Sequence, residues 1–212
     1  FKEEGFGKRE ISPMIGQKLE LENILSKSSR DWDGGFAIAG MVGHGDAFVM
    51  RDQSGIRPAY WYADDEVAVV TSERPVIQTT FNVPLEKIQE VSPGHALIIK
   101  QSGEVQEHKV MADAPRKACS FERIYFSRGS DASIYKERKE LGAALAPAIL
   151  KSINHDLENT VFSYIPNTAS VAFRGLAEEL DQFCNHIKRD KIMQAGSGLS
   201  ESELFDSISA SR

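Results

Sequence analysis

The alternation of apolar and polar positions divides the chain into a strand-rich first part and a helix-rich second part. Residues 14–25 place most of their apolar side chains on one stripe, which predicts a helix after a polar, extended segment over residues 1–13. Short apolar runs bounded by turn residues predict strands at 35–43, 47–51, 59–63, 66–71, 95–100 and 104–110. Short connections between successive runs predict antiparallel hairpins, and the run at 35–43 is expected to be buried.

In the second part, apolar residues recur mostly at helical rather than strand spacing. Helical periodicity returns at 135–153, where Pro147 is an expected kink or break, and at 168–192, where Thr168 is an expected N-cap. Apolar, β-favouring runs predict strands at 119–126 and, buried between the two helices, at 160–166. A GSG linker at 196–198 precedes a last short helix, which begins with a serine cap and covers 200–209.

This order of elements predicts an α+β protein with two domains. The first part is antiparallel by its hairpin spacing, and the helix–strand–helix order of the second part is typical of the opening of a parallel α/β domain. A loop-like stretch with a proline, MADAPRKA at 111–118, marks the expected boundary. We therefore expect domains at residues 1–114 and 115–212.

Composition narrows the possible functions. The 212 residues carry 25 basic and 31 acidic side chains, a net charge of −6, which disfavours a strongly basic nucleic-acid binder. No apolar run approaches the roughly 20 residues that span a bilayer, so no membrane segment is expected. With two cysteines, Cys119 and Cys184, the chain is not a disulfide scaffold, which favours a reducing, cytoplasmic location.

The most distinctive motif is RDQSGIRP at residues 51–58. Asp52 favours a turn, Gly55 permits a positive φ, and the flanking Arg51 and Arg57 are placed to form an arginine–carboxylate pair that locks this turn. A structural turn between strands is the first interpretation. The alternative is that Arg57 helps to position an anionic ligand.

Other residue types give no self-sufficient active site. Ser72 is expected to cap a short helix over 73–79, and no spacing links it to a histidine in a catalytic triad. The five histidines form no metal-ligand pair, and the two cysteines form no CxxC motif. Burial is the first interpretation for both Cys119 and Cys184. A helix beginning after the strand at 160–166 is a weak candidate anion site.

Four segments, taken together, resemble one family. They are GGFAIAGMVGHGDAFVMRDQSGIRP (34–58), VVTSE (69–73), VSPGHALII (91–99) and CSFERIYFSR (119–128). In order and spacing they are similar to amidophosphoribosyltransferases, and the likeness continues through Arg138 and Gly142 to cover roughly residues 30–182. The RDxxGIRP motif followed by SE is shared more loosely with other class II glutamine amidotransferases, including asparagine synthetases, whereas CxFExIYFxR is much more specific to the phosphoribosyl enzymes.

The resemblance implies a fold and a reaction. It implies the second half of an αββα N-terminal-nucleophile glutaminase sandwich, followed by the start of an α/β type I phosphoribosyltransferase domain. In this family an N-terminal cysteine releases ammonia from glutamine, and the ammonia reacts with phosphoribosyl pyrophosphate, held with Mg²⁺, in the first step of purine synthesis. Glutamine and phosphoribosyl pyrophosphate are therefore the implied substrates of the parent enzyme.

The departures from the family lead us to expect that this chain is catalytically silent alone, with no catalytic residue of its own. Phe1 is not a nucleophile, and the family's phosphoribosyl pyrophosphate loop is not found. Gln53 stands where proline is usual, and RGSD at 128–131 replaces the usual RPDS. Cys119 matches an iron–sulfur ligand of some members, but a cluster needs four thiolates, so none is expected here.

Two other functions stay open. The chain is alternatively a non-catalytic scaffold or regulatory relative, an interpretation favoured by its unusual tail after residue 190. An asparagine synthetase-like enzyme would share RDxxGIRP, but CSFERIYFSR argues against it. Because half a sandwich leaves sheet edges and apolar faces uncovered, we also expect a homo-oligomer.

Overall fold

A computed structural model describes residues 3–195, 198 and 200–209. The expectations for Phe1 and for most of the GSG linker lie outside the described residues. The chain divides into two compact units, residues 1–128 (unit 1) and 129–212 (unit 2), each described here by itself. The domain boundary expected after residue 114 stays a prediction. The mixture of helices and sheets confirms the α+β class in its coarse form.

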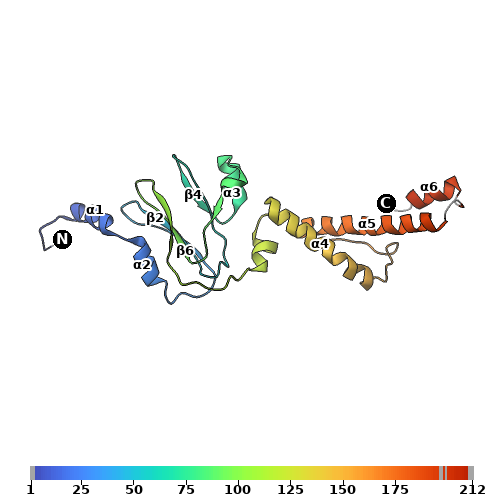
Figure 1. Ribbon diagram of the computed structural model, residues 1–212, viewed down its shortest axis with the longest axis horizontal. Helices are drawn as coiled ribbons and strands as arrows, with labels where there is room; N and C mark the ends of the chain where they lie inside the picture. Colours follow the sequence, from blue (N-terminus) through green and yellow to red (C-terminus); the bar gives the residue numbers. More distant parts are fainter. Residues whose placement is uncertain (1–2, 196–197, 199, 210–212) are drawn as a thin grey trace. The chain divides into compact units, whose positions relative to one another are not determined.

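Unit 1 contains two antiparallel sheets and several helices (Figure 1). Its elements are α1 (Lys8–Lys18), α2 (Leu21–Ser28), β1 (Ala37–Met41), β2 (Ala47–Arg51), β3 (Tyr60–Ala63), β4 (Ala68–Thr71), α3 (Arg74–Phe81), η1 (Leu85–Lys87), β5 (Gln89–Glu90), β6 (His95–Ile99), β7 (Val105–Lys109) and the π-helical turn η2 (Glu122–Phe126). Sheet A has the order β1-β2-β6-β7, and sheet B has the order β4-β3-β5. The predicted hairpins β1–β2, β3–β4 and β6–β7 are confirmed.

The core of unit 1 lies in successive layers. Leu25 of α2 packs on Met50 and Ala96 of sheet A in one buried cluster. The opposite face of sheet A contributes Leu97 to a second cluster, which contains residues of sheet B. Helix α3 lies against β3 and β4 and buries Ile77 completely. The layers therefore run helix, sheet, sheet, helix.

Several boundaries at the start of the chain differ from the prediction. The segment expected to be extended forms part of α1, whose first turn is closed by a hydrogen bond from the Gly7 N–H to Glu10 Oε2 (2.9 Å). The single helix expected over 14–25 is split, because Leu19 adopts an extended conformation between α1 and α2. Helix α3 has Glu73 as its N-cap, so the prediction that Ser72 caps this helix is wrong.

Strand β1 forms as predicted but is not buried. It lies at the edge of sheet A and pairs only with β2 within the described chain. Ile38 is 36% exposed and Met41 is 80% exposed. The apolar run predicted a buried strand, whereas its edge position leaves most of the strand open to solvent.

Residues 119–126 form a helical turn rather than the predicted strand. The Glu122 N–H donates to Cys119 O, and the Ser127 N–H donates to Glu122 O. Neither sheet takes up this segment as a strand, and an ion pair through Glu122 holds it in unit 1. Its aromatic side chains, which suggested a strand, are mostly exposed. This tertiary contact thus outweighs β-propensity.

Unit 2 is helical in its described part, with α4 (Ala132–Ser152), α5 (Ser170–Ala195) and α6 (Glu201–Ser209). Asp131 caps α4 by accepting hydrogen bonds from the backbone N–H groups of Ser133 and Ile134. Helix α4 continues through Pro147, where a kink was expected. Helix α5 begins two residues after Thr168, its expected cap, which lies in a turn. Ser200 caps α6 as predicted, and Glu203 completes the reciprocal pair.

Helices α4 and α5 approach each other at two glycines. A Cβ at Gly142 would lie 1.7 Å from Ala172 O, and one at Gly175 would lie 1.9 Å from Lys139 O. Only glycine permits this backbone contact. Leu150 and Leu176 belong to the buried cluster that the two helices share, and Cys184, expected to be buried, is partly buried.

The buried strand predicted at 160–166 does not form. The segment is non-helical, and Val161 is 93% exposed and Ile165 85% exposed. A strand requires a hydrogen-bonded neighbour, and the described residues of unit 2 contain helices but no strand. The prediction rested on apolar composition, which does not show whether a neighbouring strand is present.

Candidate functional site

The motif at residues 51–58 begins on the last residue of β2 and turns around a buried carboxylate. Asp52 is fully buried, and both of its carboxylate oxygens accept hydrogen bonds from the backbone. Oδ1 accepts from the N–H groups of Ser54 (3.1 Å) and Ile56 (2.9 Å). Oδ2 accepts from those of Arg57 (3.0 Å) and Phe36 (3.3 Å). One side chain therefore fixes the turn and ties it to the residue before β1.

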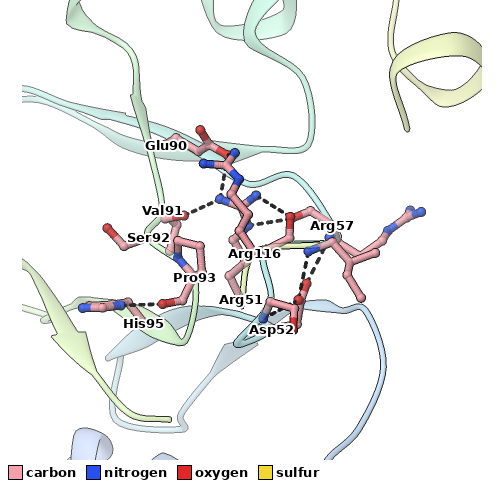
Figure 2. A network of polar contacts seen from close by, with 12 residues as sticks. Arg51, Asp52, Arg57, Glu90, Val91, Ser92, Pro93, His95 and Arg116 are labelled. Carbon is pink, nitrogen blue, oxygen red and sulfur yellow. Dashed lines mark hydrogen bonds and ion pairs between the residues drawn. The ribbon is translucent and has the colours of Figure 1, made fainter. Parts of the chain in front are cut away.

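Arg51 is the second buried group of the motif. Its side chain lies between the turn and strand β5 (Figure 2). Nε donates to Arg57 O (2.6 Å) and Nη2 to Gly55 O (3.1 Å). Nη1 donates to Val91 O (2.7 Å) and lies 2.6 Å from Glu90 Oε1. All three guanidinium nitrogens are thus engaged within the protein.

The predicted arginine–carboxylate pair within the motif is wrong. Adjacent residues at the end of a strand project to opposite sides, so Arg51 and Asp52 diverge. Arg51 pairs with Glu90 instead, and Arg116 Nη2 lies 3.6 Å from the same Glu90 oxygen. The turn itself, with its buried carboxylate, is as the motif predicts.

Gly55 has a steric reason to be glycine. Its φ of +64° lies in the left-handed region, as the turn prediction required. A Cβ there would also lie 2.9 Å from Cγ of Pro93 and 3.4 Å from Nη2 of Arg51. Any side chain at this position would therefore strain the backbone and press on the Arg51 contacts.

Arg57 faces outward from the turn and is 43% exposed. Its Nη1 pairs with Glu122 Oε1, whose side chain is almost buried, and its guanidinium carbon lies 5.3 Å from the centre of the Phe126 ring. The backbone N–H of Lys117 also donates to Ser54 O (2.9 Å). The motif is therefore joined to the segment 117–126 at two points. A ligand-positioning role for Arg57 stays a prediction.

Sequence patterns did not identify the glutamates of this network. Glu90 and Glu122 lie 39 and 65 residues from their arginine partners. No local spacing connects such residues, so only the fold brings them together.

A second polar cluster, also not predicted, lies in the β1–β2 turn. Asp46 Oδ1 accepts from the Gln101 N–H (2.9 Å), and Oδ2 lies 3.0 Å from Lys100 Nζ and 3.1 Å from His44 Nε2. The His44 contact does not have the geometry of a full hydrogen bond. Burial alone would raise the pKa of Asp46, but these donors outweigh burial and lower its pKa from 3.8 to about 2.

Cys119 is the one residue that the sequence analysis considered as a metal ligand. Cys119 is partly buried in unit 1, at the start of the segment that leads into η2. In the described part of the chain no three His, Cys, Asp or Glu side chains are grouped so that they could hold an ion. The expectation that no iron–sulfur cluster is bound stays a prediction. Nor is any helix among the described residues both long and apolar enough to cross a bilayer.

Comparison with known proteins finds a matching family model and similar proteins, which are amidophosphoribosyltransferases. A family model described as glutamine amidotransferases class-II matches residues 10–124. The amidophosphoribosyltransferase of Lachancea kluyveri is 27% identical over 174 residues, which cover 77% of this chain and 34% of that protein. The Escherichia coli (strain K12) amidophosphoribosyltransferase is 28% identical over 164 residues, 71% of this chain and 32% of that protein. This chain thus spans about a third of the length of these relatives.

Two solved structures have a similar fold. One, described as the allosteric regulatory enzyme of purine biosynthesis, has a TM-score of 0.59 and 26% identity, and the match covers 76% of this chain and 33% of that one. The other is glutamine phosphoribosylpyrophosphate amidotransferase from B. subtilis complexed with ADP and GMP. It has a TM-score of 0.57 at 24% identity, over 82% of this chain and 38% of that one, and shows the fold alone.

These findings confirm the resemblance to amidophosphoribosyltransferases that the four sequence segments indicated. The family match covers more than half of the chain and includes the whole network around Asp52. The chain therefore belongs to the class II glutamine amidotransferases.

Proposed function

We propose that this chain is part of a glutamine amidotransferase of the amidophosphoribosyltransferase type, which uses glutamine-derived ammonia and phosphoribosyl pyrophosphate to make phosphoribosylamine for purine synthesis. The joint between Arg57 and Glu122 carries this proposal. It connects the RDQSGIRP turn, a motif of class II amidotransferases, with CSFERIYF, the segment specific to the phosphoribosyl enzymes. The relatives and their shared order of motifs support it.

Within such an enzyme, unit 1 is the second half of an N-terminal-nucleophile glutaminase sandwich. The helix, sheet, sheet, helix layering of unit 1 supports this assignment. Unit 2 is the beginning of a type I phosphoribosyltransferase domain. Its non-helical, apolar segment at 160–166 lies between two helices, and a β-favouring segment in that place is in keeping with a parallel α/β domain.

The motif residues of this chain serve as a frame. Asp52 fixes the turn, Arg51 ties it to strand β5, and Arg57 joins it to the segment before unit 2. The polar groups of Arg51 and Asp52 are engaged inside the protein, and Arg57 pairs with Glu122, so we assign none of the three to bond breaking. We expect the isolated chain to be inactive toward glutamine, with the nucleophile supplied by another part of the enzyme.

The remaining features belong to the whole enzyme. Glutamine and phosphoribosyl pyrophosphate are its proposed substrates, and Mg²⁺ would accompany the pyrophosphate. No grouping of ligands in the described residues fits such an ion, so we assign this chain no role in holding it. We also propose a cytoplasmic homo-oligomer that binds neither nucleic acid nor membranes.

The first experiment is N-terminal sequencing and intact-mass measurement of the native product, together with an assay of glutamate release from glutamine. We expect a product much heavier than 23.5 kDa that begins with cysteine and hydrolyses glutamine. The 212-residue chain produced alone should release no glutamate. Glutamate release by the isolated chain would overturn the assignment of the nucleophile to another segment.

A non-catalytic scaffold or regulatory relative is the alternative function. The tail after residue 190, which departs from the family pattern, favours it. A native product that begins near Phe1 and releases no ammonia from glutamine would establish this alternative and exclude the first proposal.

A further inference from the structure

Sheet A ends in β1 on one side and in β7 on the other, and the two edges differ in character. Proteins usually protect an exposed edge strand with charged side chains, proline or a bulge. Strand β7 carries Glu107 and Lys109. Strand β1 carries neither charge nor proline, its pairing with β2 continues without a bulge, and four of its five residues are exposed. The β1 edge is therefore open to another strand.

The hydrogen bonds of the β1–β2 hairpin show which backbone groups of β1 are available. The Val42 N–H donates to Asp46 O (2.7 Å), and the Asp52 N–H donates to Phe36 O (2.9 Å). These bonds place the even-numbered residues of this segment in the hydrogen-bonded pairs with β2. Because such pairs alternate in an antiparallel ladder, the N–H and C=O groups of the odd-numbered residues point to the open edge. The odd-numbered residues of β1 are Ala37, Ala39 and Met41.

The side chains of β1 fit a second copy of the same strand. In an antiparallel pairing about a two-fold axis at Ala39, this residue faces its own copy, and Met41 faces Ala37 of the second copy. On the other face of the sheet, Ile38 lies opposite Gly40 of the second copy. The two large exposed side chains, Met41 at 80% and Ile38 at 36% exposed, thus each meet a small residue.

Charge favours self-pairing through β1 and opposes it through β7. A two-fold axis places the central residue of a strand opposite itself, so a charged residue there meets a like charge. The central residue of β7 is Glu107, whereas that of β1 is the uncharged Ala39. Of the two edges of sheet A, β1 is therefore the one suited to a second copy.

We propose that β1 of the 212-residue chain pairs with β1 of a second copy, so that their two A sheets form one continuous sheet. Ile38 of the second copy would then rest beside the Phe48 ring, which lies over Gly40 at 2.6 Å from the place of a Cβ. The inference names the surface of the homo-oligomer proposed above, and it does not rest on the proposed reaction.

The test is sedimentation velocity of the 212-residue chain over a concentration series, with hydrogen–deuterium exchange of residues 37–41 in the same samples. We expect a monomer–dimer equilibrium, and slower exchange of these amides as the dimer forms. A chain that stays monomeric, or a dimer in which these amides exchange as fast as in the monomer, would overturn the proposal. Glutamate release is measured separately, so either proposal can fail without the other.

A charge at the centre of β1 tests the pairing directly. Ala39→Glu places like charges opposite each other and should weaken the dimer by about tenfold or more. Ala112→Glu, the same change at an exposed residue outside the sheets, should alter the dissociation constant by less than about twofold. Equal dissociation constants for the two variants would refute an interface at β1.

Two further measurements test the register without depending on one variant. A mixture of Ala39→Glu and Ala39→Lys chains should associate more tightly than either variant alone, because opposite charges then face each other. Met41→Ala removes an exposed side chain, so it should leave urea unfolding of the monomer unchanged and weaken the dimer about threefold. A mixture no tighter than its components, or an unchanged dimer in Met41→Ala, would contradict this register. Protection of residues 37–41 in a monomeric, longer native product would assign the edge to a segment of the same chain and overturn the second copy.

Discussion

The buried carboxylate of Asp52 makes a sharp prediction about stability. Asp52→Asn keeps the shape of the side chain but replaces one oxygen with an NH₂ group. Whichever way the amide turns, two of the four backbone N–H groups then face a donor. Two hydrogen bonds to a charged acceptor are lost, and the two N–H groups remain buried without partners.

The magnitude follows from these four contacts. A hydrogen bond to a charged group contributes about 1.5–3 kcal/mol, so two of them contribute about 3–6 kcal/mol. Removing a buried charge offsets part of this loss, because the carboxylate no longer has to be desolvated. We expect unit 1 to lose about 3 kcal/mol of its free energy of unfolding, a large share of the 5–15 kcal/mol typical of a domain.

Urea unfolding followed by tryptophan fluorescence measures this loss. Both tryptophans, Trp32 and Trp61, lie in unit 1, so the signal reports that unit. With a slope near 2 kcal/mol/M, the midpoint should fall by about 1.5 M. Asp65→Asn, the same change at an exposed residue, should stay within about 0.5 kcal/mol of the parent. Equal midpoints for Asp52→Asn and Asp65→Asn would refute the role of the carboxylate.

Three further predictions address other contacts. Folding lowers the pKa of Asp46, so the ionised carboxylate stabilises the folded state by up to about 2 kcal/mol above pH 3.8, and this contribution is lost as the pH falls toward about 2. The urea midpoint should therefore fall less steeply with decreasing pH in Asp46→Asn than in the parent chain. Glu122→Gln should speed hydrogen–deuterium exchange of residues 119–127 without unfolding the sheets; unchanged exchange would show that the ion pair with Arg57 does not hold this segment. Gly142→Ala should lower the thermal midpoint of helix unfolding in circular dichroism, because its Cβ would lie 1.7 Å from a backbone oxygen of α5. A Cβ at Gly129 meets only ordinary contacts, so Gly129→Ala is the control, and equal midpoints for the two variants would contradict the close helix crossing.

The sequence predicted the hairpins of unit 1 well because their information is local. Residues 47–51 were predicted as a strand and form β2 with the same limits. Turn residues with special conformations, such as Gly55, mark where strands end. The buried carboxylate of Asp52 could likewise be expected in a turn, since its partners lie within a few residues, apart from Phe36.

The partners of the arginines could not be predicted in the same way. Asp52 is adjacent to Arg51 and five residues from Arg57 in the sequence, yet both arginines pair with glutamates from distant segments. A one-residue offset along a strand reverses the direction of a side chain, so proximity in sequence is a poor guide to ion pairs. The network becomes visible only once β5 and η2 are placed.

Two predicted strands did not form, again because their formation depends on distant partners. Apolar and aromatic residues at 119–126 and 160–166 have strand propensity, but a strand also needs a neighbour with free hydrogen-bonding groups. In unit 1 an ion pair and a π-helical turn hold the first segment. In unit 2 the described elements are helices, so the second segment stays without regular structure and most of its side chains are exposed. If unit 2 opens a parallel sheet, as proposed above, a neighbouring strand would cover the exposed Val161 and Ile165, and residues 160–166 should be protected from hydrogen exchange in any longer product that contains this strand.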